Sequence, residues 1–445
     1  MAESNKIRIG CGAGFSGDRI EPAVILVDQA DLDYLVLECL AERTIALAQK
    51  RKLFDPDSGY DPLLERRIGS LLPQLIDKEV RLITNMGAAN PVAAAKKIVD
   101  MARSKNLKIK VAAVFGDDVL QWVTDQRNVL RDIDNGRLVA EYDVISANAY
   151  LGVDAILPAL ESGAHIIITG RVADPSLFLA PMIHELKWDT ANHAIMGKGT
   201  ITGHLLECAG QVTGGYFADP VHKPVLNMEA LGHPFADIFP DGSSIITKVA
   251  GTGGRIDLQT VKEQLLYEVV NPYEYITPDV VADITTVRLE QVAEDTVRIS
   301  GGSGKERPPM LKASVGYKAF YLGEGEISYA GPSCLERAEL AGRILERRLK
   351  DKVDELTIDF IGLNASFRRK TIAAAQAGPE VRLRIAGKSQ NAANAALVGE
   401  EVEALYTNGP AAGGGVRKNV TDVIGIVSAL VDRNAVTSTC KIFES

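Results

Sequence analysis

The fold is decided by the stretch Ile7-Arg-Ile-Gly-Cys-Gly-Ala-Gly-Phe-Ser-Gly-Asp-Arg19, in which a short apolar run enters a glycine-rich loop. Residues 6–11 alternate apolar and polar side chains, as a β-strand does. The same order of apolar run and small-residue loop recurs in three further segments, at residues 81–91, 108–118 and 165–175.

Helical patterns follow two of these loops, at residues 91–103 and 175–186. Strand, loop and helix in that order are typical of a parallel α/β sheet. Short runs rich in isoleucine and valine suit strands that are buried on both faces. We therefore predict a Rossmann-like, mostly parallel sheet for the first half of the chain.

The second half shows a different pattern, in which strand-like alternation is followed by strongly helical blocks. This pattern predicts an α+β domain with a mixed or antiparallel sheet. The best boundary lies near Pro240-Asp-Gly242, so we predict one domain at residues 1–245 and a second at residues 246–445. The expected strands are 281–289, 296–300, 311–317, 326–330, 356–363 and 381–385, and the expected helices are 258–270, 334–352 and 391–405.

Composition excludes several classes of protein. The 445 residues carry 49 Lys and Arg against 58 Asp and Glu, without the basic stripe that a nucleic-acid binder needs. No run approaches the ~20 apolar residues of a membrane span, and no secretory signal is visible at the N-terminus. The five cysteines are scattered and form no C-x-x-C pair, which favours reduced thiols in the cytoplasm.

The 40 glycines are enriched, and many fall in loops where backbone N–H groups can face an anion. In the first loop, Gly12, Gly14 and Gly17 match the bare G-x-G-x-x-G spacing, although the acidic ribose partner could be Glu38 or Glu42. Three interpretations stay open for this loop: a nicotinamide or flavin site, a phosphate or carboxylate pocket, and a tight turn without a ligand.

The loop Gly170-Arg-Val-Ala-Asp-Pro-Ser176 follows a predicted parallel strand, where α/β sheets place ligands. Arg171 could hold a carboxylate or phosphate with two hydrogen bonds. Asp174 could either act in the chemistry or cap the next helix.

His204 and Glu207 lie three residues apart and share one face of a predicted helix, which Gln211 continues. The pair suits an acid–base or metal site, but no third metal ligand is apparent, and a solvated stripe is the alternative. We predict no bound metal. Cys208 beside Glu207 is a poor nucleophile, because the neighbouring carboxylate discourages the thiolate.

Over nearly its whole length the sequence resembles the acyclic terpene utilisation (AtuA) family. Besides the first loop, the resemblance rests on Asp33-Tyr-Leu-Val-x-Glu38, Thr84-Asn-Met-Gly-Ala-Ala-Asn-Pro91, Thr169-Gly-Arg-Val-Ala-Asp174, Gly203-His-Leu-Leu-Glu-Cys208, Gln211-Val-Thr-Gly-Gly215, Gly251-Thr-Gly-Gly254, Gln264-Leu-Leu-Tyr-Glu268, Pro278-Asp-Val280 and Glu324-Gly-Glu-Ile-Ser-Tyr-Ala-Gly331.

The resemblance implies a place in the degradation of citronellol-type branched compounds through coenzyme A thioesters. Longer members carry an additional C-terminal ferredoxin-like domain, which this sequence is expected to lack. A small companion subunit could supply that part, and we also expect a homo-oligomer.

We therefore expect a cytoplasmic catabolic enzyme that acts on a branched carboxylate or acyl-CoA by hydratase or lyase chemistry, without a required cofactor. The alternatives are a partner-dependent subunit that binds an acyl ligand, and a nucleotide-cofactor oxidoreductase. The expected catalytic residues are Glu207, His204, Asp18 and Asp174. The expected substrate-binding residues are Gly12, Gly14, Ser16, Gly17, Arg19, Asn85, Gly87, Asn90, Arg171, Gln211, Thr252, Gly253 and Gly254.

Overall fold

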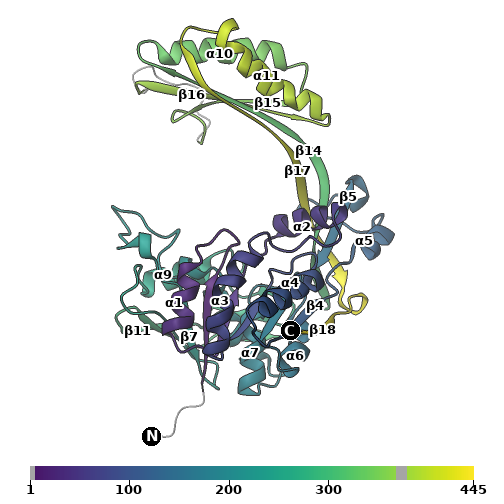
Figure 1. Ribbon diagram of the computed structural model, residues 1–445, viewed down its shortest axis with the longest axis vertical. Coiled ribbons are helices and arrows are strands. Elements are labelled where there is room, and N and C mark those ends of the chain that lie inside the picture. The colour runs from purple at the N-terminus through teal and green to yellow at the C-terminus, as the bar shows by residue number, and fades with distance from the viewer. Residues whose placement is uncertain (1–5, 367–377) are drawn as a thin grey trace. The chain divides into compact units, whose positions relative to one another are not determined.

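The computed structural model describes residues 6–366 and 378–445, and its chain divides into two compact units (Figure 1). Unit 1 comprises the residues up to Gly316 together with Ile426–Ser445, and unit 2 comprises Tyr317–Gly425. The boundary predicted at 245/246 falls inside strand β8 (Ser244–Lys248) of unit 1, which pairs with β7 (Pro234–Ile238).

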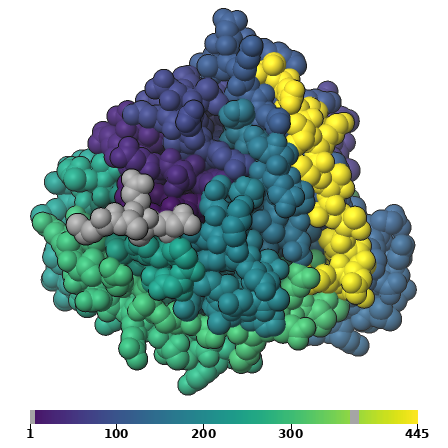
Figure 2. Space-filling model, turned by 90° about the horizontal axis from the view of Figure 1, so that it is seen from below, coloured from purple at the N-terminus to yellow at the C-terminus, as the bar shows by residue number. Residues whose placement is uncertain are grey.

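Unit 1 is built on one large sheet whose central strands are parallel, as the sequence predicts for the first half. These central strands are, in spatial order, β1 (Ile7–Ala13), β2 (Tyr34–Leu37), β3 (Arg81–Thr84), β6 (Ile166–Thr169) and β4 (Lys110–Phe115). Antiparallel strands extend the sheet on both sides. Beyond β1 come β7, β8, β12 (Thr296–Ser300) and β11 (Arg288–Ala293), and beyond β4 comes β18 (Thr439–Glu444), which runs along the surface in Figure 2.

Helices cover both faces of this sheet, because successive strand side chains alternate between two apolar layers. In β2, for example, Leu35 and Leu37 face one core, and Tyr34 and Val36 face the other. The first layer contains α1 (Glu21–Gln29), α3 (Leu64–Asp77) and α4 (Pro91–Ser104), and the second contains α6 (Val153–Glu161), α7 (Ser176–Leu186) and α8 (His193–Glu207).

The chain reverses its direction across the sheet between the neighbouring strands β3 and β6. After β3, helix α4 leads outward to β4, whereas after β6 helices α7 and α8 lead back to β7, beyond β1. Their connections therefore leave on opposite faces and open a crevice at the carboxyl ends of the strands. This switch point is where open α/β sheets bind ligands.

Smaller elements surround the carboxyl ends of the central strands. Helices α2 (Glu42–Phe54) and α5 (Leu120–Gln126) follow β2 and β4, and strand β5 (Val144–Ala149) comes next in the chain. Helix α9 (Leu258–Leu266) follows β8. A short sheet of β9 (Tyr275–Ile276), β10 (Val281–Asp283) and β13 (Ser303–Lys305) packs on α8. Gly197 of α8 has no side chain to separate the helix from β13, whose Ser303 carbonyl would lie 2.0 Å from an added Cβ.

Unit 2 has the ferredoxin-like order of elements. The chain enters through β14 (Met310–Ala330) and leaves through β17 (Gly413–Asp432), and between them come α10 (Cys334–Leu349), β15 (Glu355–Ile361), β16 (Glu380–Ser389) and α11 (Ala392–Asn408). The sheet order is β15-β16-β14-β17, and both helices pack on one face over a single apolar core. The mixed or antiparallel sheet predicted for the second half is thus present, and a ferredoxin-like unit lies inside the chain.

Within the described residues, no helix combines the length and the apolar character needed to cross a membrane.

Candidate functional site

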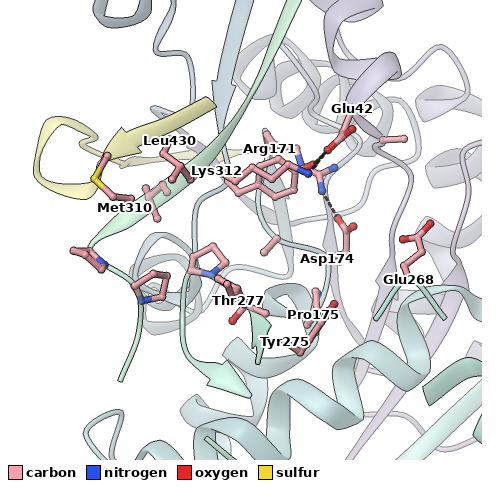
Figure 3. Close-up of a pocket in the computed structure, with 18 of the residues that line it drawn as sticks. Glu42, Arg171, Asp174, Pro175, Glu268, Tyr275, Thr277, Met310, Lys312 and Leu430 are labelled. Carbon is pink, nitrogen blue, oxygen red and sulfur yellow. Dashed lines mark hydrogen bonds and ion pairs between the residues drawn. The ribbon is translucent and has the colours of Figure 1, made fainter. Parts of the chain in front are cut away.

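The main cleft of unit 1 lies at the carboxyl ends of the central strands and has a volume of about 900 Å³ (Figure 3). Polar side chains from six segments line it together with an apolar wall. The polar side chains are Glu42, Arg43, Tyr150, Arg171, Asp174, Glu268, Tyr275, Thr277 and Lys312, and the wall includes Ile276, Pro278, Pro308, Pro309, Met310, Leu311 and Leu430.

Arg171 is the buried anchor of this cleft, with 2% of its surface exposed. Its Nη2 donates to Asp174 Oδ1 at 2.7 Å, and its Nη1 donates to the Leu40 carbonyl. The guanidinium lies 4.1 Å from the centre of the Tyr150 ring, a cation–π contact. Both terminal nitrogens are therefore engaged within the protein, which favours a role in positioning Asp174 over direct binding of a substrate anion.

Buried carboxyl groups surround Arg171. Glu38, at the end of β2, accepts hydrogen bonds from the Leu40 N–H and from Asn85 Nδ2, both at 2.8 Å. Burial raises the pKa of Glu38 well above its usual value, and the charge of Asp174 raises it further. Burial also raises the pKa of Asp174, although Arg171 opposes this shift.

Asp117 follows β4 and supports the same loop from beneath. Its Oδ2 accepts hydrogen bonds from the Arg171 backbone N–H at 3.0 Å and from Asn148 Nδ2 at 2.7 Å. Burial raises the pKa of Asp117 to about 6. Because Gly170 lacks a side chain, the Asp117 carboxyl can reach this position, which lies 2.4 Å from where a Cβ would be.

The exposed ion pair in the cleft joins Lys312 and Glu42, whose Nζ and Oε1 atoms lie 2.6 Å apart. The Tyr150 hydroxyl donates to the same Glu42 oxygen at 2.8 Å. Lys312 contributes an accessible cation to the polar side of the cleft, where Figure 3 shows it extending toward Glu42.

His204 and Glu207 form a buried pair at the carboxyl end of α8. Nδ1 of His204 lies 2.8 Å from Glu207 Oε1, whereas His204 Nε2 and Glu207 Oε2 have no hydrogen-bond partner among the described residues. The ring of Tyr275, a cleft residue, contacts the His204 ring with centroids 4.9 Å apart. The pair therefore lies directly behind the cleft lining.

Burial raises the pKa of Glu207 to about 7, and the negative charges of Asp174 and Glu268 add to that shift. Burial is the largest single effect on the pKa of His204 and lowers it. The hydrogen bond to Glu207, the charge of Glu207 and the backbone of Gln264 and Leu265 together raise the pKa overall. A carboxyl group that titrates near neutrality can both give and take a proton at physiological pH.

A second cleft of about 550 Å³ contains the first glycine loop and the end of α8. Asp18, Arg19 and Gln211 line it, together with Phe15, Cys208, Tyr216, His233 and Tyr267. Asp18 Oδ2 accepts a hydrogen bond from the Gly14 N–H at 2.8 Å, and Arg19 donates to the carbonyls of Met228 and Glu229. The sequence-predicted residues thus fall into two groups: Arg171 and Asp174 line the main cleft, and Asp18 and Arg19 line the second.

The first glycine loop is used for close contacts within the protein. An added Cβ at Gly14 would lie 2.4 Å from the Cys208 carbonyl carbon, and one at Gly12 would lie 2.8 Å from Leu37 and Ala23 side-chain atoms. Gly17 lies against the Phe15 ring, and the Ser16 hydroxyl donates to Asp61 Oδ2 at 2.7 Å. Because α8 approaches Gly14 so closely and Glu38 is buried, this geometry does not favour a dinucleotide site.

The remaining predicted loop residues have local structural contacts. Asn85 is fully buried, donates to Glu38 and accepts from the Cys39 N–H at 2.7 Å. Gly87 allows close approach of the Thr169 carbonyl, and Asn90 caps α4 by accepting from the Ala93 N–H. In the segment from Thr252 to Gly254, Thr252 Oγ1 donates to the Val249 carbonyl, and Gly253 and Gly254 lie against the Asn227 and Thr213 carbonyls.

Several residues of the site were not among the predicted site residues. Glu42, Tyr150, Glu268, Tyr275 and Lys312 line the main cleft, and Asp117 supports the Arg171 loop from beneath. For Asp117 a signal exists, because it follows a predicted parallel strand as Arg171 does. Glu268 ends the motif Gln264-Leu-Leu-Tyr-Glu268 that carries part of the family resemblance. Tyr275 and Lys312 have no such signal, because they come from distant segments that only the tertiary structure brings together. In the part of the chain that the structure describes, no three His, Cys, Asp or Glu side chains are grouped to hold a metal ion.

The fold and the clefts define an α/β protein with a polar, carboxyl-rich cleft at the switch point of a mostly parallel sheet. The family described as "Acyclic terpene utilisation family protein AtuA" matches residues 7–442, so the chain belongs to this family. Membership links the chain to acyclic terpene utilisation. No curated protein and no solved structure matches it significantly.

Proposed function

We propose that this protein is a catabolic enzyme of the hydratase or lyase type that transfers protons on a branched carboxylate or its coenzyme A thioester. The observation that carries this proposal is a pair of carboxyl groups with raised pKa values: Asp174, which lines the main cleft, and Glu207, which lies directly behind its lining. Family membership supports the substrate class only in its coarse form, acyclic terpene utilisation.

The proposed chemistry is the addition of water to a branched 2-enoyl thioester, or its reverse. Glu207, held by His204, takes a proton from water while the water oxygen bonds to the β-carbon. The electrons of the carbon–carbon double bond move to the α-carbon, which receives a proton from the Asp174 carboxyl group. One water molecule is added, and the two carboxyl groups then exchange protons with solvent.

The cleft offers complementary walls for such a substrate. The apolar wall with Pro308, Met310 and Leu430 would contact the branched hydrocarbon, and Lys312 would lie near its polar end. Arg171 would act by holding Asp174 in place. Asp18 and Arg19 line the second cleft, so we assign them no step.

The five cysteines fit a cytoplasmic location for this enzyme, because none forms a disulfide and Cys11, Cys39 and Cys334 are buried. Reduced thiols are the usual state of cysteines in the cytoplasm.

Glu207→Gln should abolish most of the turnover of a branched 2-enoyl coenzyme A thioester. Loss of a general base typically costs about 10²–10⁴-fold in rate. Because the wild-type base must be ionised, kcat should rise as the pH increases through about 7, the pKa of Glu207. The assay follows the ultraviolet absorbance of the conjugated thioester, across a panel of citronellate-type thioesters and free acids.

Glu263→Gln is the matched control, because Glu263 is an exposed glutamate that pairs with Lys223 outside the main cleft. Full turnover by Glu207→Gln would refute the assigned role. Binding of the thioesters without turnover by the wild-type protein would instead favour the partner-dependent subunit.

A further inference from the structure

Glu42 and Glu268 are the carboxylates of the main cleft that have no role in the proposed mechanism, and Glu42 is paired with Lys312. Glu268 follows α9 and lines the main cleft together with Asp174 and Tyr275 (Figure 3). Its neighbour Tyr267 lines the second cleft and hydrogen-bonds to the Glu268 side chain. Two adjacent residues, Tyr267 and Glu268, therefore line different clefts.

The backbone of Glu268 is left-handed, with φ of +59°. Residues other than glycine and asparagine rarely adopt this backbone conformation. It persists where the surrounding structure imposes it. Such strain gathers at functional sites. At this position the left-handed backbone carries a charged side chain that lines the cleft. A glycine would adopt the same backbone conformation more easily.

Glu207 presents a complementary feature from behind the cleft. It is 9% exposed, its Oε1 is occupied by His204, and its Oε2 is buried without a partner among the described residues. Glu268 lines the same cleft as Tyr275, whose ring contacts His204, the hydrogen-bond partner of Glu207. The negative charge of Glu268 adds to the raised pKa values of Glu207, Asp174 and Cys208. A buried carboxylate oxygen without a donor is costly, so this oxygen is suited to accept a hydrogen bond from a bound molecule.

We propose that Glu268 is a further catalytic residue, which together with Glu207 Oε2 holds and orients the reacting water. This inference rests on the proposed function. Glu268 accepts one water proton as a hydrogen bond, and Glu207 removes the other as the water oxygen bonds to the β-carbon. The α-carbon takes its proton from Asp174.

The decisive experiment compares wild type with Glu268→Gln, Glu268→Asp and the control Glu274→Gln. Glu274 is an exposed glutamate six residues further on, paired with Lys305 at 3.3 Å. With a branched 2-enoyl coenzyme A thioester as the probe, Glu268→Gln should lower kcat by about 10²–10⁴-fold while KM stays near the wild-type value. Glu268→Asp should recover part of kcat, and Glu274→Gln should match wild type.

A second measurement needs no substrate. Infrared titration, with Glu207→Gln to assign the Glu207 carboxyl band, should show a lower pKa for Glu207 in Glu268→Gln, because a neighbouring negative charge is removed. Circular dichroism melting checks that the variant is folded.

The two measurements separate the proposals. Wild-type turnover with unchanged kcat in Glu268→Gln would overturn the inference and leave the proposed function standing. If the wild-type protein turns over no thioester, the proposed function fails. The infrared result then decides whether Glu268 and Glu207 share one locus: a lowered Glu207 pKa supports this, and an unchanged pKa overturns it.

Discussion

At the scale of the residue, carboxyl groups whose pKa values are raised by burial gather in and behind the lining of the main cleft. Asp117, Glu38, Asp174 and Glu207 all have raised pKa values, and desolvation is the largest cause for each. Arg171 opposes that shift at Asp174, with which it forms an ion pair, and also at Glu38. Groups of this kind are uncommon outside functional sites, because burying a charge lowers stability.

Asp117→Asn should change how stability depends on pH. Since the pKa of Asp117 is raised from 3.8 to about 6 in the folded state, the wild-type free energy of unfolding loses up to about 3 kcal/mol as the pH rises from about 4 to about 6. The variant lacks this titrating group. Its stability relative to wild type should therefore increase over that interval and stay constant above it.

Urea unfolding of both proteins at closely spaced pH values measures this difference. A difference that does not vary with pH would show that the Asp117 pKa is not raised. The same experiment with Asp241→Asn is a control, because the hydrogen bonds from Ser243 lower the pKa of Asp241.

At the scale of the element, loops after parallel strands position the site, but they do so in different ways. The loop after β6 holds Arg171 and Asp174 at the cleft, whereas the loop after β1 uses its glycines to let α8 approach. The end of α8 carries His204 and Glu207 behind the cleft. The contact at Gly14 therefore helps to place the proposed acid–base pair.

Gly14→Ala should destabilise unit 1 by about 1–3 kcal/mol, because the new Cβ would lie 2.4 Å from the Cys208 backbone and force α8 to move. Turnover should fall as well, since the shift displaces Glu207. Chemical denaturation and kinetics of the same preparation measure both effects.

Gly69→Ala is the matched control for this substitution. Gly69 lies inside α3, where an added Cβ meets only the Met101 sulfur at 3.9 Å. This change should stabilise the protein by roughly 0.5–1 kcal/mol through helix propensity. Equal stabilities of the Gly14 and Gly69 variants would contradict the role of the Gly14 contact.

At the scale of the whole molecule, two units have separate apolar cores. The cores of unit 1 lie on both faces of the large sheet, and the core of unit 2 lies between its sheet and the helices α10 and α11. All residues of the two clefts belong to unit 1.

Leu383→Ala should destabilise unit 2 by about 2–5 kcal/mol, because Leu383 is fully buried in its core. Hydrogen exchange should increase in α10 and α11, while the central strands of unit 1 keep wild-type protection. Increased exchange in β2 and β3 to the same extent would show that the two units unfold as one.

The sequence by itself determined the parallel sheet, the antiparallel remainder, the family, and the placement of Arg171 and Asp174 at a strand end. It could do so because strand–loop–helix order and side-chain periodicity are properties of neighbouring residues. The insertion of unit 2 is harder to infer, since β14 and β17 lie about 100 residues apart and pair only in space.

Only the tertiary structure decided which loops share a cleft. It separates Asp18 and Arg19 from Arg171 and Asp174, and it brings Glu268, Tyr275 and Lys312 to the main cleft from distant segments. It also raises the pKa of Glu207, because desolvation depends on every element that packs around the group. Local patterns therefore predict where polar residues leave a strand, and long-range contacts decide which of them meet.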